Sequence, residues 1–230
     1  MTAREHTSQV IDWIRQRTDS VILFYSAGKD SIALLDLVAP RFRRVVCVYM
    51  YLVKGMRHIG KYIEWSRLRY PNVEFHEVPH WNLTHLLRGG AYCQRRDDVK
   101  LMRFKDVAES CRLRFGVDWC LYGMKQSDNM NRRIMLRGKD YELQAIQPET
   151  RNAYPLSMWG NNEVLAYIRQ NRLPEPVRYS IRGKSQGLML NEDCFLWLRE
   201  NYPDDLRRII EAFPQSEVIL YKADHREGNN

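Results

Sequence analysis

The chain has 230 residues, enough for one full hydrophobic core with room for a small appended region. Apolar residues make up 44% of it, but the longest apolar run, Val21 to Tyr25, is only strand-sized, which argues against a membrane-spanning helix and a membrane partner. No apolar stretch follows the N-terminal charges, so no secretion signal is predicted and the expected compartment is the cytoplasm. The formal net charge of +8 indicates anionic partners, either a polyphosphate substrate or nucleic acid on a basic surface.

In chain order, the first half alternates between strand and helix patterns. Continuous apolar runs are typical of strands buried on both faces, and apolar residues three or four positions apart indicate helices. Strands are expected at residues 21–25, 45–51, 73–78 and 119–123. Helices are expected at residues 7–17, 32–38 and 59–68 and over most of 82–115. Four such cycles predict an α/β fold with a doubly wound, mainly parallel sheet, similar to a Rossmann fold.

After Gly123 the pattern changes. Arg133–Leu136 and Tyr141–Ile146 are expected to pair as a short hairpin, and Asn161–Gln170 to form a helix. A loop rich in Pro, Gly and Arg, Pro174–Gln186, follows. Two helices and a short apolar run complete the chain, at residues 192–200, 204–212 and 218–221. We therefore expect one domain over residues 1–187 and a helical C-terminal extension over residues 188–230 that packs on it.

The segment Ser26-Ala-Gly-Lys-Asp-Ser31 joins the first strand to the helix that follows. Backbone N–H groups at a helix N-terminus lack intrahelical partners and attract phosphate oxygens. Ala27 and Gly28 let that backbone approach a ligand closely, Lys29 adds positive charge, and the hydroxyls of Ser26 and Ser31 add donors. The ordinary P-loop is excluded, because Leu23 stands where that motif needs its first glycine and an aspartate follows Lys29.

Asp30 would repel a phosphate unless a divalent cation lay between them, so Mg²⁺ with Asp30 as its ligand is expected. Asp128 also follows a predicted strand, and open α/β sheets place ligands at the carboxyl ends of their strands. A metal shared by Asp30 and Asp128 and ordinary turn capping are both left open.

The loop resembles the Ser-Gly-Gly-Lys-Asp-Ser loop of the PP-loop ATP pyrophosphatases, the adenine nucleotide α-hydrolase superfamily. Two later stretches, Gly123–Arg133 and Tyr154–Pro174, are similar to the branch that contains phosphoadenylylsulfate (PAPS) reductase. The resemblance covers roughly residues 18–187. It implies that the 26–31 loop, residues Ser26, Ala27, Gly28, Lys29, Asp30 and Ser31, cradles the phosphates of an adenine nucleotide.

The same resemblance implies that Gly123 lines the nucleotide cleft and that Arg132 and Arg133 lie over it. The end of the second strand, Tyr49-Met-Tyr51, lacks the Asp-Thr-Gly that the family has there, and Met50 is assigned to the nucleotide site as well. The chain departs from PAPS reductases at its tail, which lacks their Glu-Cys-Gly-Leu-His cysteine. Five widely spaced cysteines predict neither a disulfide framework nor an iron–sulfur cluster. The histidines show no ligand spacing and are expected to be structural or at the surface.

The resemblance favours an enzyme that binds ATP with Mg²⁺ and cleaves it at the α-phosphate, adenylating an acceptor and releasing pyrophosphate. Lys29, Asp30, Arg132 and Arg133 are the expected catalytic residues. One alternative is a PAPS-using reductase or sulfotransferase-like enzyme without the usual C-terminal cysteine. The other is a non-catalytic nucleotide-binding subunit that contacts nucleic acid through the basic stretch Arg95–Lys105. The acceptor, the nucleic-acid partner and a homo-oligomer are left open.

Overall fold

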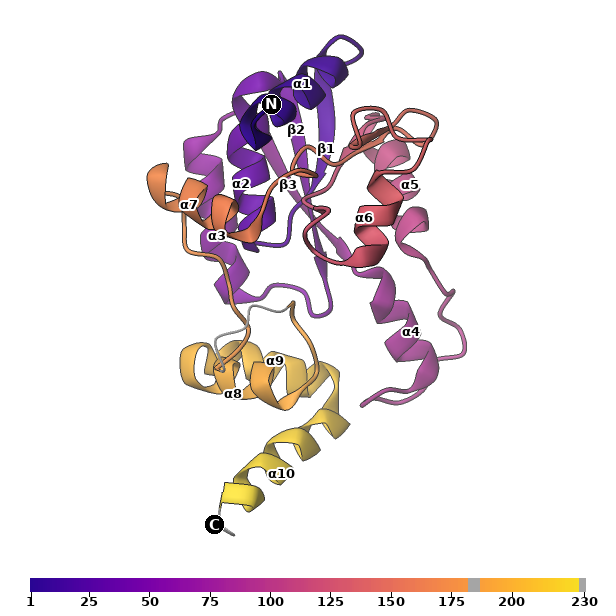
Figure 1. Cartoon of the computed structure of the whole chain (residues 1–230). Coiled ribbons are helices and arrows are strands. Elements are labelled where there is room, and N and C mark those ends of the chain that lie inside the picture. The colour runs from indigo at the N-terminus through magenta and orange to yellow at the C-terminus, as the bar shows by residue number, and fades with distance from the viewer. Residues whose placement is uncertain (182–186, 228–230) are drawn as a thin grey trace. The chain divides into compact units, whose positions relative to one another are not determined.

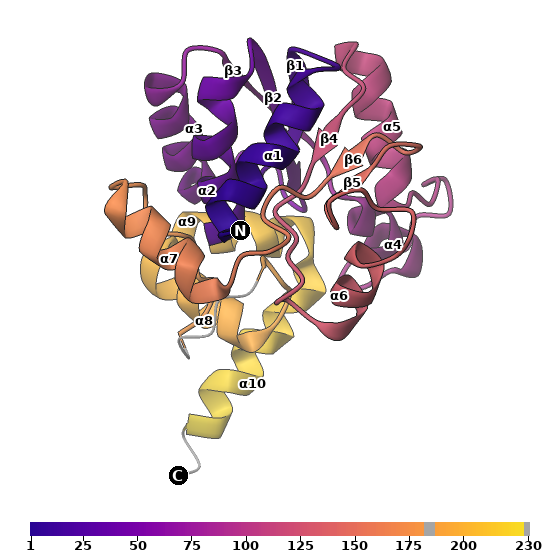
Figure 2. The ribbon, with the colours of Figure 1, turned by 45° about the horizontal axis from the view of Figure 1, so that its top comes forward.

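The computed structural model of the protein describes residues 1–181 and 187–227 (Figure 1). Its sheet has six strands in the order β3-β2-β1-β4-β6-β5 (Figure 2). β1 runs parallel to β2 and β4, β4 runs parallel to β6, and β5 is antiparallel to β6. The strands are β1 (Ser20–Phe24), β2 (Arg44–Tyr51), β3 (Val73–Pro79), β4 (Cys120–Leu121), β5 (Ile146–Gln147) and β6 (Asn152–Ala153). The expected α/β fold with a mainly parallel sheet is confirmed.

Along the sequence, one helix precedes the first strand, and the others lie between strands or after the last strand. They are α1 (Ala3–Arg15), α2 (Lys29–Val38), α3 (Arg57–Arg69), α4 (Trp81–Gly89), α5 (Phe104–Phe115), α6 (Met130–Leu136), α7 (Asn161–Gln170), α8 (Glu192–Asn201), α9 (Pro203–Ala212) and α10 (Glu217–Glu227). Short 3₁₀ turns occur at Ala39–Arg41 and Pro214–Ser216. The C-terminal region is therefore helical, as expected. Within the described residues, no helix has the length and apolar character needed to cross a bilayer.

The chain divides into two compact units. Unit 1 contains residues 1–49, 65–76 and 108–176, and unit 2 contains residues 50–64, 77–107 and the chain from 177 onward. The expected domain boundary at 187–188 stays a prediction. Residues 182–186 of the expected loop 174–186, and the last three residues of the tail, lie outside the described residues.

Helix α1 begins four residues before the expected start at Thr7, because a capping box precedes it. The backbone N–H of Glu5 donates to the Thr2 hydroxyl at 3.2 Å, and the Thr2 N–H donates to the Glu5 carboxylate at 2.8 Å. These two bonds satisfy donors that a helix N-terminus otherwise leaves unpaired.

The hairpin expected between Arg133–Leu136 and Tyr141–Ile146 is wrong. Residues 130–136 form helix α6, because the Asn129 side chain caps it by accepting from the Arg132 N–H at 2.9 Å. The antiparallel pair lies further along the chain, between β5 and β6, with Ile146 opposite Ala153. The change matters for the site, because α6 carries both candidate arginines.

The order of the strands reverses at β1. From β1 the chain continues to β2 on one side, whereas β4 pairs with β1 on the other side. In open α/β sheets, ligands bind at such a switch point, outside the carboxyl ends of the two strands. In unit 1 those ends lead into the 26–31 loop and into the loop of residues 122–129.

Candidate functional site

The 26–31 loop leads from β1 into α2. Gly28 is the N-cap of α2, and the first intrahelical bond runs from the Ile32 N–H to the Gly28 carbonyl at 3.1 Å. Among the described residues, no side chain caps this helix. The first-turn N–H groups therefore lack the side-chain acceptor that caps many helices, and such groups favour an anion.

The serine hydroxyls organise the loop from within. The Ser31 hydroxyl donates to the Gly28 carbonyl at 3.0 Å and accepts from the Ser26 N–H at 3.1 Å. The two hydroxyl oxygens lie 3.3 Å apart, and the Gly28 N–H lies 3.3 Å from the Ser26 oxygen. Since its one proton is used on Gly28, the Ser31 hydroxyl shapes the loop in this conformation and does not offer a free donor.

Ala27 adopts a left-handed conformation with φ of 56° and is fully buried. The Ser-Gly-Gly-Lys-Asp-Ser loop, to which this segment is similar in sequence, has glycine at this position. A non-glycine residue in this region costs roughly 1–2 kcal/mol, so the loop keeps its shape against local strain. Strain of this kind is typical of segments that a surrounding structure holds for binding.

Alternating charges connect this loop to the loop after β4. Lys29 Nζ lies 2.9 Å from Asp30 Oδ2, and Asp30 Oδ1 lies 2.7 Å from Lys125 Nζ. The same Lys125 nitrogen lies 2.7 Å from Asp128 Oδ1, and Asp128 Oδ2 pairs with Arg132. Two carboxylates thus alternate with three cations in a row of five charged side chains. This row carries a net positive charge at the N-terminus of α2. We call these five residues the ion chain.

The electrostatics keep Asp128 ionised. Burial alone would raise the pKa of its carboxyl group, but hydrogen bonds from Lys125 and the nearby Arg132 guanidinium outweigh burial and lower that pKa. The Lys125 backbone N–H adds a bond of 2.9 Å to the same carboxylate. Asp128 is therefore a fixed negative charge that orients Arg132.

Sequence reasoning did not identify Lys125, which has no exposed surface. Its signal is a polar Lys-x-x-Asp spacing directly after a buried strand, which places Lys125 and Asp128 in one turn. Nothing in that pattern indicates that Asp30, on another loop, completes the contacts. Lys125 is thus an addition to the predicted site.

Gly123 lies against the start of α2. A Cβ atom at this position would lie 3.0 Å from the Asp30 Cβ and 3.2 Å from the Asp30 carbonyl carbon. Glycine is therefore required for the end of β4 to approach Asp30 this closely. The expectation that Gly123 lines a nucleotide cleft stays a prediction.

The two candidate arginines differ in environment. Arg132 is half-buried and pairs with Asp128 one helical turn before it, whereas Arg133 is exposed and has no ion pair with any described residue. Neighbouring residues on a helix point about 100° apart, so the two cannot share one direction. Met50, near the end of β2, belongs to unit 2, and its assignment to the nucleotide site stays a prediction.

A metal bridging Asp30 and Asp128 does not fit the residues as they lie, because the Lys125 ammonium is in contact with both carboxylates. In residues 1–181 and 187–227, no group of three His, Cys, Asp or Glu side chains could hold a metal ion. All five cysteines are buried and free, and burial raises the pKa of the Cys111 and Cys194 thiols to about 11. The expected Mg²⁺ that arrives with the nucleotide, with Asp30 as its ligand, stays a prediction.

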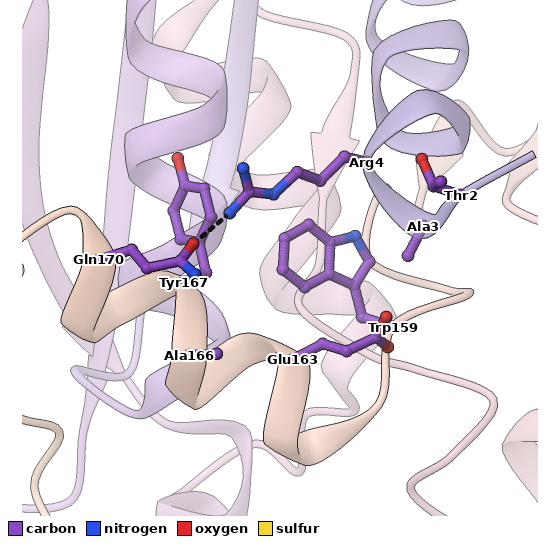
Figure 3. Close-up of a pocket in the computed structure, with 8 residues that line it drawn as sticks. All are labelled: Thr2, Ala3, Arg4, Trp159, Glu163, Ala166, Tyr167 and Gln170. Carbon is purple, nitrogen blue, oxygen red and sulfur yellow. Dashed lines mark hydrogen bonds between the residues drawn. The ribbon is translucent and has the colours of Figure 1, made fainter.

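A separate surface pocket of about 290 Å³ lies between α1 and α7 in unit 1 (Figure 3). Arg4 donates to Gln170 at 2.8 Å and lies over the Tyr167 ring. The Glu163 carboxylate accepts from the Gly160 N–H at 2.6 Å. These polar groups are satisfied within the protein, so the pocket offers little to a ligand and is not our candidate site.

The sequence matches no protein-family model and has no significant match among curated proteins. Among solved structures, the chain is similar to the U34-tRNA thiolase NcsA from Methanococcus maripaludis, which was solved with its 4Fe–4S cluster. The TM-score is 0.51 and the identity 13%, over 93% of this chain and 76% of that one. What the two chains share is the fold, here an α/β fold with a mainly parallel sheet.

Two further solved structures are similar at lower TM-scores. The PAPS reductase from Candida auris, in a phosphate complex, has a TM-score of 0.48 and 16% identity over 76% of this chain and 82% of that one. The NH3-dependent NAD synthetase from Campylobacter jejuni subsp. jejuni NCTC 11168, in complex with nitrate, has a TM-score of 0.46 and 13% identity, over 96% and 95%. At these identities the likeness is one of fold, and it does not resolve the branch.

Proposed function

We propose that the chain binds ATP or a related adenine nucleotide with its phosphates on the 26–31 loop. It cleaves the nucleotide at the α-phosphate, adenylates an acceptor and releases pyrophosphate. The observation that carries this proposal is the uncapped start of α2 at the β1–β4 switch point, with Lys29 in its first turn. This place combines free backbone N–H donors with a lysine, and it lies at the carboxyl ends of the strands, where open α/β sheets bind ligands.

In this proposal the protein contributes mainly electrostatic stabilisation. Negative charge grows on the leaving pyrophosphate during cleavage, and preorganised donors lower the barrier most where charge develops. Lys29 is about one-fifth exposed, so its ammonium can exchange the contact with Asp30 for one with a phosphate. Arg132, held by Asp128, supplies a planar guanidinium suited to phosphate oxygens. Mg²⁺ enters only as a counter-ion carried by the nucleotide.

The two alternatives have less support from the structure. A PAPS-using reductase needs a reactive thiol, and the cysteines of the described chain are all buried. A nucleic-acid interface at Arg95–Lys105 would need free cations, but Arg95 pairs with Asp97 and Arg96 with Asp98, at 2.8 and 2.6 Å. These pairs neutralise part of the stretch. We therefore retain the nucleotide-cleaving enzyme as the proposed function.

Lys29→Ala is expected to weaken ATP binding by roughly 1.5–3 kcal/mol, because it removes a charged hydrogen-bond donor from the phosphate loop. That loss corresponds to an affinity lower by roughly one to two orders of magnitude. Isothermal titration of ATP into the wild type and the variant measures it.

Lys222→Ala is the matched control, since it removes the same charge from an exposed position on α10. Its affinity for ATP should equal that of the wild type. If Lys29→Ala and the wild type bind ATP equally, the 26–31 loop does not hold the phosphates. Equal weakening in both variants would indicate attraction by net charge alone.

A further inference from the structure

Lys125 is a buried cation whose position needs an explanation. Its side chain has no exposed surface, and it lies in the loop after β4. Lysine is almost never fully buried unless it is paired, because removing an ammonium from water costs several kcal/mol. Two carboxylate oxygens, one from Asp30 and one from Asp128, lie 2.7 Å from its nitrogen. The protein therefore buries a charged group, at a cost in free energy, at the carboxyl ends of the strands, where open α/β sheets bind ligands.

The place that this nitrogen occupies is one that a divalent cation could take. Asp30 and Asp128 come from different loops, and an oxygen of each is directed at the same point. Without a cation between them, these two partly buried carboxylates would repel each other. Mg²⁺ and Mn²⁺ prefer such oxygens, at about 2.1 Å for Mg²⁺.

We propose that Lys125 is a positioning residue that acts as a built-in cation between Asp30 and Asp128 and replaces a divalent metal ion there. Its ammonium ties the 26–31 loop to the loop after β4 by contacting one oxygen of each carboxylate. The second oxygen of Asp128 is then free to orient Arg132, and the second oxygen of Asp30 to pair with Lys29. One part of this proposal rests on the proposed function, namely that the metal ion of the reaction arrives only with the nucleotide. The role of Lys125 as an internal cation does not depend on it.

Lys125→Ala tests the replacement directly. Removing the side chain leaves the two carboxylates and a space for water and an ion, so the variant should gain a Mn²⁺ site that the wild type lacks. We expect about one bound Mn²⁺ per chain by electron paramagnetic resonance, measured without nucleotide. The thermal unfolding midpoint should be lowered in EDTA and partly restored by Mn²⁺. A purely structural lysine would lower the midpoint without creating a metal signal.

The control is the double variant Lys125→Ala with Asp128→Asn, which removes one of the two carboxylates. It should lose both the Mn²⁺ signal and the restoration of the midpoint. A folded Lys125→Ala that binds no Mn²⁺ overturns the proposal, and so does a signal that the double variant retains.

The wild-type protein gives a second test that does not depend on the folding of Lys125→Ala. When the wild type and Asp128→Asn are titrated with Mn²⁺ without nucleotide, the two proteins should give the same bound-Mn²⁺ signal. A wild-type Mn²⁺ site that disappears in Asp128→Asn would show that a metal, and not Lys125, lies between the carboxylates. Since no nucleotide is present in any arm, the failure of ATP to bind would leave these results unchanged.

Discussion

Asp205→Ala is expected to lower the free energy of unfolding by about 3–5 kcal/mol, the scale for removing one partner of a buried charged contact. Asp205 is fully buried in unit 2. Its carboxylate accepts from the backbone N–H groups of Arg57 and His58, at 2.8 and 2.9 Å, where α3 begins. It also contacts His58 Nδ1 at 2.7 Å. Alanine would leave three donors without their acceptor, and each such buried group costs about 1–3 kcal/mol.

The neighbouring residue gives the control for this prediction. Asp204 also carries a carboxylate on the first turn of α9, but its ion pair with Arg57 is solvent-exposed. Exposed pairs contribute at most about 1 kcal/mol, so Asp204→Ala should change stability little. Urea unfolding followed by circular dichroism compares both variants with the wild type. Similar midpoints for the two variants would refute a special role for the buried carboxylate.

The same contacts predict a dependence of stability on pH. Burial lowers the pKa of His58, although its hydrogen bond with Asp205 opposes this. In the neutral ring, Nδ1 donates to Asp205 and Nε2 accepts from the Tyr179 hydroxyl at 2.7 Å. Below about pH 6.5 the unfolded histidine takes up a proton that the folded one resists, so stability falls as the pH drops.

Burial would raise the pKa of Asp205, but the hydrogen bonds from His58 and Arg57 outweigh it and lower that pKa. Its stabilising contribution is present above the unfolded pKa and is lost as the pH falls through the folded one. His58→Asn keeps a donor for Asp205 without an imidazole that titrates. The fall in the urea midpoint between pH 7 and pH 5 should therefore be smaller in this variant than in the wild type. An equal fall in both would assign the pH dependence to other groups.

Much of the fold could be predicted because its signals are local. The strand before the 26–31 loop is a continuous apolar run, and the helix at Asn161–Gln170 has the predicted bounds. The segment 133–136 was misassigned because a short apolar run fits a strand or a helix equally well by periodicity. The decisive feature was the cap that Asn129 provides just before it.

The candidate site could be predicted only in part. The 26–31 loop is one segment with its own chemistry, so its sequence indicates phosphate binding directly. The burial of Lys125 depends on Asp30, a residue of another loop, and only the pairing of β1 with β4 brings the two together. Likewise, the sequence did not distinguish Arg132 from Arg133, because the distinction requires a helix and the partner Asp128. The missing information was tertiary contact.

Arg132→Ala is expected to lower kcat for pyrophosphate release by about 100- to 1000-fold, the usual loss when a preorganised donor to developing charge is removed. Asp128 holds the guanidinium, and the ion chain links it to Lys29, which is proposed to contact the same leaving group. A donor that acts mainly as charge develops contributes more to kcat than to KM. Arg132→Lys keeps the charge but loses the planar fork, so it should restore kcat only partly.

Arg133→Lys, measured beside these variants, decides which arginine carries the effect. Since Arg133 is exposed and points away from its neighbour on α6, its replacement should have the smaller effect on kcat. Lys139→Ala, in the exposed segment after α6, controls for the loss of local positive charge and should keep wild-type kcat. If Arg132→Ala retains wild-type kcat, the ion chain ends in a structural pair and Arg132 takes no part in cleavage. A loss confined to Arg133→Lys would instead mean that α6 meets the nucleotide with its solvent-exposed side.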